Sequence, residues 1–172
     1  YNLKKDYSHL KIAQWFLDPL NKNGPDFFKN KNRILDKSDV IDANFLTTSP
    51  KAVSLLSKKV KNFFIPNPSD DSMETLNNFD KDCSNDVFFA LSHGVHRGHL
   101  KNRSTDDREK FIKDLVNKCE NIRFDLFGMN NIQPIWADQY FKNISNSKMG
   151  LNLSSGTPIK YSSSDRITQL IG

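Results

Sequence analysis

Two loops of the sequence carry the residue types that bind phosphate. Residues 92–101 combine glycines with cationic or ionisable side chains, in the order His93, Gly94, His96, Arg97, Gly98, His99 and Lys101. Residues 154–166 add Gly156, Lys160 and Arg166. Dispersed positive charge, backbone N–H groups beside glycines and a helix N-terminus together suit a diphosphate. We therefore predict that the two loops form one anion site.

The second loop leads into a predicted helix. Ser163 or Ser164 can cap this helix, and Asp165 lies where the positive end of the helix dipole favours a carboxylate. Apolar residues follow at the spacing of one helix face: Ile167, Leu170 and Ile171. The stretch 150–172 thus has the order strand, loop and helix. It forms either an anion site or an ordinary connection with a capped helix.

Three of the four histidines lie close together, at His93, His96 and His99. Their spacing falls in a glycine loop without a neighbouring Cys or Asp, so we predict no metal site. His93 and His96 are candidate catalytic residues, although a hydrogen-bonding role in the loop is the more common one. Asp18 ends a predicted strand and is a third catalytic candidate. It could act as a general base or an interdomain contact, and a plain turn before Pro19 is the more ordinary interpretation.

Apolar runs and turn residues place both loops in an α/β fold. Strands are predicted over residues 10–18, 40–48, 60–65, 86–91, 122–127 and 150–154. Helices are predicted over residues 27–37, 50–59, 106–120 and 138–147, and after residue 163. This alternation is typical of parallel sheets covered by helices, so we predict two Rossmann-like halves. Because ligands bind at the carboxyl ends of parallel strands, both polar loops fall at the expected edge.

Residues 66–72 separate the two halves. This segment has two prolines and five short polar residues, which is typical of a linker or hinge. We predict that residues 1–70 are the last part of an N-terminal Rossmann-like domain and that residues 71–172 form a second one. The chain begins at Tyr1 and stops while its last helical pattern continues, so we expect a fragment of a longer protein.

Most aromatic side chains are expected in the core rather than on a base-stacking platform. This expectation covers Trp15, Trp136 and the phenylalanine pairs at 27–28, 63–64 and 88–89. The helix predicted over residues 106–120 has an apolar face made of Phe111, Ile112, Leu115, Val116 and Cys119. Residues 72–85 are polar and are expected to contain at most one helical turn.

Composition narrows the classes of function. The chain has 172 residues, a net charge of +5 and 37% hydrophobic residues, which indicates a globular protein. Its Lys and Arg residues are scattered without a run of five, so we predict no nucleic-acid partner. Cys83 and Cys119 lack metal-ligand spacing, which indicates free thiols in a reducing, cytoplasmic compartment. No apolar run approaches the length of a membrane span.

Residues 86–172 also contain a series of local patterns in a characteristic order. These are DVFF at 86–89, SHG at 92–94 with Arg97, the helix over 108–119, FDLFG at 124–128, SKMGLNL at 147–153 and SSDRITQLIG at 163–172. In this order they resemble the C-terminal, nucleotide-sugar domain of GT-B-type glycosyltransferases. The resemblance is closest to the "glycosyltransferases group 1" kind related to spore-coat maturation proteins, which occurs in bacterial surface-polysaccharide clusters.

The resemblance implies roles for individual residues. It implies that Arg97 and Lys101 bind the donor diphosphate, beside the backbone at Gly94. It also implies that the segment 150–172 holds the phosphates and ribose, through Lys160, Tyr161, Ser163, Ser164, Asp165, Arg166 and Gln169. Many relatives carry two Glu residues where this chain has Tyr161 and Gln169. Gln169 can still hydrogen-bond ribose hydroxyls, whereas the usual role of the Glu pair is altered.

The implied reaction is the transfer of a sugar from a nucleotide-diphosphate donor to a glycan or lipid-linked acceptor. It uses no metal and no cofactor, and its context is surface polysaccharide or lipopolysaccharide biosynthesis. Residues 1–70 would belong to the acceptor domain, and a lipid-linked acceptor leaves peripheral membrane association open. Two alternatives are a non-catalytic module of the same fold that binds a nucleotide or phosphorylated ligand, and a nucleic-acid-binding protein suggested by the basic pI of about 9.1. No recognition helix or basic stripe supports the latter.

Overall fold

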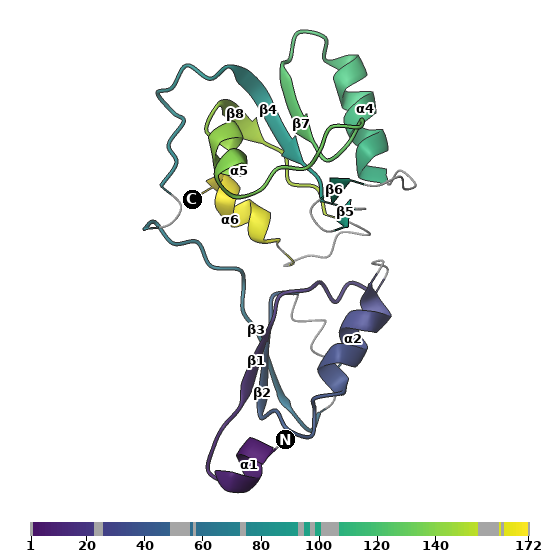
Figure 1. Cartoon of the computed structure of the whole chain (residues 1–172), viewed down its shortest axis with the longest axis vertical. Helices are drawn as coiled ribbons and strands as arrows, with labels where there is room; N and C mark the ends of the chain where they lie inside the picture. Colours follow the sequence, from purple (N-terminus) through teal and green to yellow (C-terminus); the bar gives the residue numbers. More distant parts are fainter. Residues whose placement is uncertain are drawn as a thin grey trace. The chain divides into compact units, whose positions relative to one another are not determined.

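A computed structural model describes residues 2–22, 26–48, 56, 58–72, 75–92, 95–96, 99–100, 107–154, 162 and 164–171 (Figure 1). The chain divides into two compact units. The first comprises Tyr1–Pro68 and Ser154–Thr168, and the second comprises Ser69–Leu153 and Gln169–Gly172. Each unit contains a three-stranded parallel sheet with helices. The predicted class, α/β with two Rossmann-like parallel-sheet halves, is confirmed.

The first unit is built on a sheet with the strand order β1-β2-β3. The strands β1 (Ala13–Phe16), β2 (Ala43–Leu46) and β3 (Lys61–Phe64) are parallel and pair in register. Helix α2 (Phe27–Leu35) connects β1 to β2, and a short helix that the sequence did not predict, α1 (Asn2–Asp6), precedes β1. The helix predicted over residues 50–59 lies largely outside the described residues.

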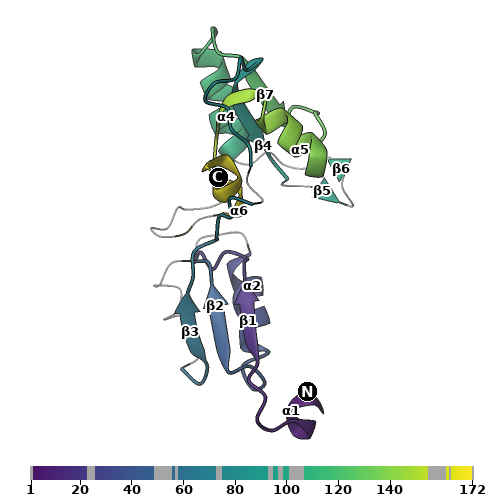
Figure 2. The same cartoon turned by 90° about the vertical axis from the view of Figure 1, so that its left-hand side faces the viewer.

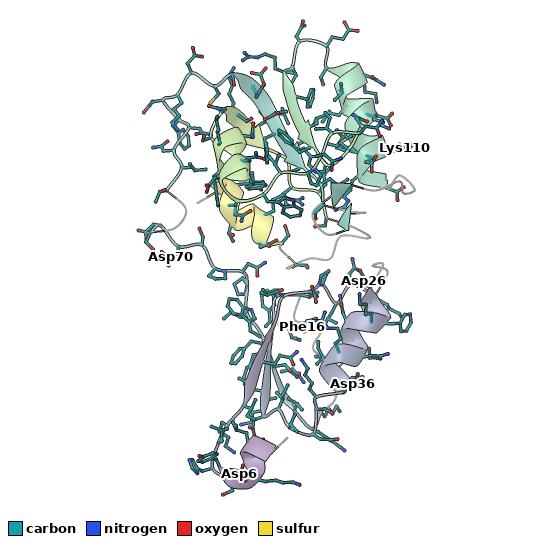
Figure 3. All side chains as sticks on the ribbon, in the orientation of Figure 1. Asp6, Phe16, Asp26, Asp36, Asp70 and Lys110 are labelled. Atoms are coloured by element: carbon teal, nitrogen blue, oxygen red, sulfur yellow. The ribbon has the colours of Figure 1, made fainter. Side chains whose placement is uncertain are left out.

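One face of this sheet carries the core. Successive strand residues point to opposite faces, and the buried cluster on one face is Phe16, Leu20, Ile34, Leu46 and Leu56. Helix α2 supplies Ile34 and lies behind the sheet in Figure 2, and Figure 3 labels Phe16 between the two. Trp15, Phe45 and Phe63 form a row across the opposite face. Trp15 is 52% exposed, so its predicted place in the core is wrong, because the described residues leave this face open.

The second unit has β4 (Asn85–Ala90) at the centre of its main sheet. β7 (Phe124–Phe127) pairs with one side of β4 and β8 (Ser147–Gly150) with the other, and all three strands are parallel. A separate antiparallel pair, β5 (Val95–His96) and β6 (His99–Leu100), follows β4. The helices of this unit are α4 (Asp107–Lys118) and α5 (Ala137–Ile144), and α6 (Asp165–Ile171) is divided between the units, with the part from Gln169 onward in this one.

Helices cover both faces of this sheet. On one face Phe89 and Leu91 pack against Ile112 of α4. On the other face Phe88 packs with Ile144 of α5 and Leu170 of α6. Figure 1 shows α4 and α5 on opposite sides of the sheet. The result is a three-layered arrangement, which explains why residues 87–91 are a continuous apolar run.

Two helix predictions and one strand prediction need correction. The predicted strand over residues 150–154 is in fact Ser147–Gly150, and the predicted helix over 138–147 ends at Ile144, because residues 147–150 pair with β4. In α4 the inward side is centred on Ile112, which leaves Phe111 51% exposed and buries Glu109. Trp136, also predicted in the core, is 50% exposed. The described residues of 75–84 form no helix, and they contain one turn, in which Lys81 N donates to Asn78 O at 3.3 Å.

Charged side chains hold the amino ends of the three strands together. The carboxylate of Asp86, in β4, accepts hydrogen bonds from Arg123 Nε at 3.1 Å and from the Arg123 backbone N–H at 2.9 Å. Lys148 Nζ of β8 lies 2.8 Å from the same carboxylate. Hydrogen bonds from Arg123 and Lys148 hold the pKa of Asp86 well below its usual range. This edge is therefore occupied by a structural ion-pair cluster.

Candidate functional site

The opposite, carboxyl edge of this sheet is where the sequence predicts the site. β4 and β8 are neighbours and parallel, so the connections that follow them leave from the same edge. Backbone pairing continues to this edge, with Leu151 N donating to Phe88 O at 2.9 Å and Leu91 N donating to Phe127 O at 2.9 Å. The sequence prediction that residues 92–101 and 154–166 follow strands of one sheet is thus confirmed for the strands themselves.

The two connections also diverge to opposite faces of the sheet. The chain after β4 leads to α4, which packs on the Phe89 face. The chain after β8 leads to α6, whose Leu170 packs on the Phe88 face. Neighbouring parallel strands whose following helices lie on opposite faces define a topological switch point. In open α/β sheets, ligands bind outside the carboxyl ends of the strands at such a point.

The connection after β7 lies at the same edge and has an unusual backbone. Every described residue with a positive φ lies in this connection or at its end: Gly128 (φ 74°), Asn130 (φ 52°) and Asn131 (φ 62°) belong to it, and Ala137 (φ 47°) is the first residue of α5. A Cβ atom on Gly128 would lie 1.7 Å from the carbonyl oxygen of Leu91, at the end of β4. Left-handed backbone is cheap for Gly and tolerated by Asn. The sequence analysis did not single out this loop, although Gly128-Met-Asn-Asn is a signal that could have identified it.

Seven of the predicted site residues belong to the two polar loops and precede α6. The residues that lie outside the described part of the chain are His93, Gly94, Arg97, Lys101, Lys160, Tyr161 and Ser163. For His96 the backbone alone is described, and it pairs with His99 across the β5–β6 hairpin. The roles predicted for these residues stay predictions, and so does the convergence of their side chains.

The remaining candidates of the second loop lie in and before α6. Asp165 is exposed and its Oδ1 accepts a hydrogen bond from the Arg166 backbone N–H at 3.0 Å. Ile167 N donates to Ser164 O at 3.1 Å, which starts the first turn of the helix. Arg166 and Gln169 are half-buried. The carboxylate at the start of α6 therefore lies where the helix dipole favours it, as predicted.

Asp18, the candidate general base, belongs to the first unit. It follows β1, and its carboxylate forms an ion pair with Arg33 Nη1 of α2 at 2.5 Å. The Arg33 guanidinium also lies over the ring of Phe16, 5.4 Å from its centroid. Both side chains of the ion pair are about half exposed. These contacts give Asp18 a structural role between β1 and α2, and its catalytic role stays a prediction.

Cys83 is buried, and both it and Cys119 are free thiols, as predicted. Within the described ranges, no three His, Cys, Asp or Glu side chains are grouped in a way that could hold a metal ion. The helices of these ranges are also too short or too polar to cross a membrane. No protein-family model, curated protein or solved structure matches the chain.

Proposed function

We propose that this protein is a glycosyltransferase of the metal-independent GT-B type. It would move a sugar from a nucleotide-diphosphate donor to a glycan or lipid-linked acceptor, in surface polysaccharide or lipopolysaccharide biosynthesis. The observation that carries the proposal is the switch point between β4 and β8. It supplies a ligand edge to the two segments whose sequences are rich in glycine and positive charge.

The chemistry of the proposed site follows from its charges. Departure of a nucleoside diphosphate from the sugar carbon leaves negative charge on the phosphate oxygens. Arg97, Lys101 and Arg166 would stabilise this charge in the transition state by charge-assisted hydrogen bonds. Backbone N–H groups beside Gly94 would add donors that need no reorganisation. The first unit would contribute to acceptor binding in the cytoplasm, near a membrane if the acceptor is lipid-linked.

Calorimetry with UDP and GDP tests the donor site. Arg97→Ala and Arg166→Ala should each weaken binding about tenfold or more, because each removes a charge-assisted hydrogen bond worth about 1.5–3 kcal/mol. Lys118→Ala is the matched control, since it removes one positive charge from the last turn of α4. If both arginine variants bind as tightly as the unchanged protein, the phosphate-site assignment is refuted.

Turnover separates the enzyme from a binding module of the same fold. The module remains a second candidate because Tyr161 and Gln169 stand where relatives of the resembled family carry Glu. An enzyme should release the nucleoside diphosphate from a donor sugar, by transfer or by slow hydrolysis. Tight nucleotide binding without release of product, in both the unchanged protein and Gln169→Glu, would favour the module.

A further inference from the structure

A row of three amide side chains crosses the sheet of the first unit. Gln14, Asn44 and Asn62 occupy paired positions on β1, β2 and β3. They lie on the same face as Phe16 and Leu46, two positions earlier along each strand, and this is the face that α2 covers. Asn44, in the middle of the row, is buried, with 3% of its surface exposed. The row is therefore a polar layer inside a core.

Hydrogen bonds satisfy one end of the row. Asn62 Nδ2 donates to the carbonyl oxygen of Val60 at 2.8 Å, and Asn44 Nδ2 donates to Asn62 Oδ1 at 2.9 Å. At the other end two acceptors are buried without a donor, namely Asn44 Oδ1 and Gln14 Oε1. Buried amide oxygens are nearly always hydrogen-bonded in folded proteins. Because Gln14 and Asn44 are paired on adjacent strands, one donor between them would satisfy both oxygens.

We propose that one ordered water molecule lies between Gln14 Oε1 and Asn44 Oδ1 and donates a hydrogen bond to each. A water molecule has two O–H donors, which matches the two unsatisfied oxygens. A metal cation fits less well, because hard cations take about six or more oxygen ligands and the row offers two. The water completes a hydrogen-bonded chain that runs from β1 through β2 to the backbone before β3.

The water has a structural consequence for the sheet. A shift of one residue in the pairing of β1 with β2 would turn Gln14 to the open face and separate the two oxygens. The bridge therefore ties the register of β1 to that of β2, in addition to the packing of Phe16 and Leu46 in the core. The direct alternative is a rotation of the Gln14 amide, so that Nε2 donates to Asn44 Oδ1 without a water.

A crystal structure that resolves ordered water, together with NMR of the ¹⁵N-labelled full chain, tests the proposal. We expect a solvent peak within hydrogen-bonding distance of both oxygens, and an Asn44 side-chain NH₂ cross-peak to a long-lived water. Gln14→Met, which keeps the length of the side chain but removes its oxygen, should abolish the cross-peak. Gln139→Met, at an exposed position of α5, is the control and should leave it unchanged.

Each other outcome overturns the proposal. A direct Gln14 Nε2–Asn44 Oδ1 hydrogen bond with no solvent peak would replace the water by an amide ladder. A peak with six oxygen neighbours would identify a cation. An Asn44 cross-peak that persists in a folded Gln14→Met protein would show that any water there does not depend on Gln14.

Discussion

Replacing Gly128 by alanine tests how closely the β7–α5 connection approaches the end of β4. Gly128 has a φ of 74°, and a Cβ atom there would lie 1.7 Å from Leu91 O and 2.7 Å from Leu91 C. These are backbone atoms, and Leu91 is itself held by its hydrogen bond to Phe127 O. The clash cannot be relieved by rotating a side chain, so the ends of β4 and β7 must separate.

The cost has two parts. A left-handed conformation costs an alanine about 1–2 kcal/mol, and overpacking against a fixed neighbour adds about 1–3 kcal/mol. The sum, about 2–5 kcal/mol, is a large share of the stability of a small domain, which is about 5–15 kcal/mol. Gly150→Ala is the matched comparison, because its Cβ would meet Leu170 Cδ2, at 2.0 Å, which is the far end of a flexible side chain. We expect a cost of about 1 kcal/mol there.

Urea unfolding followed by tryptophan fluorescence measures this difference within the second unit. The chain has two tryptophans, Trp15 in the first unit and Trp136 in the second, so a Trp15→Phe background isolates the second unit. With a slope of about 2 kcal/mol/M, a cost of about 2–5 kcal/mol should lower the midpoint of Gly128→Ala by about 1–2.5 M. A midpoint equal to that of the parent protein, or a smaller shift than Gly150→Ala gives, would refute the close approach.

Two carboxylates of the second unit should respond to pH with opposite signs. Burial raises the pKa of Asp125, whereas Arg123 and Lys148 lower that of Asp86, each relative to an ordinary value of 3.8. Asp86→Asn should therefore lower the urea midpoint at pH 7, and the difference should shrink as the pH falls below about 4. Asp125→Asn should raise the midpoint at pH 7, because the ionised carboxylate is disfavoured in the folded state, and the gain should vanish below about pH 4. Urea midpoints measured from pH 3 to 7 check both, and effects of the same sign would contradict the assigned environments.

Most strands of this fold were predictable because they overlap short apolar runs bounded by turn residues, whereas β8, with the sequence Ser-Lys-Met-Gly, precedes its apolar run. Their ends were less so. Leu151 and Leu153 pack against the Phe89 cluster although β8 ends at Gly150, so burial continues where pairing stops. Hydrophobic periodicity reports burial and not strand pairing, so the strand was predicted over residues 150–154, toward the buried leucines, instead of over Ser147–Gly150.

Exposure was harder to predict than element type. Trp15 belongs to a strand that is apolar on both sides, a pattern that predicts burial on both faces of a parallel sheet. In α4, Phe111 and Ile112 are adjacent in sequence, and the inward stripe contains Ile112 with Val116 rather than Phe111. The choice between them depends on how α4 is rotated against β4 and β7, which is a property of tertiary packing.

The edge of the sheet that carries the candidate site followed from the sequence, but the switch point did not. Alternating strands and helices predict parallel strands, and parallel strands have one carboxyl edge. The order β7-β4-β8, by contrast, depends on which side of β4 the third strand joins. That choice is set by pairing between residues about 60 positions apart, such as Val87 with Met149, and no local pattern encodes it.

The two edges of the second unit's main sheet differ: contacts that stabilise the fold lie at the amino edge, and the features expected of a ligand site lie at the carboxyl edge. The amino edge has an ion-pair cluster in which Asp86 joins β4 to β8 and to the residue before β7. The carboxyl edge has the left-handed backbone of 128–137 and the switch point. Backbone strain persists only where its surroundings hold it in place, and at Gly128 the close neighbour is the backbone of Leu91. On the proposed function, changes at Asp86 should alter stability far more than nucleotide affinity, whereas changes at the opposite edge should alter affinity as well.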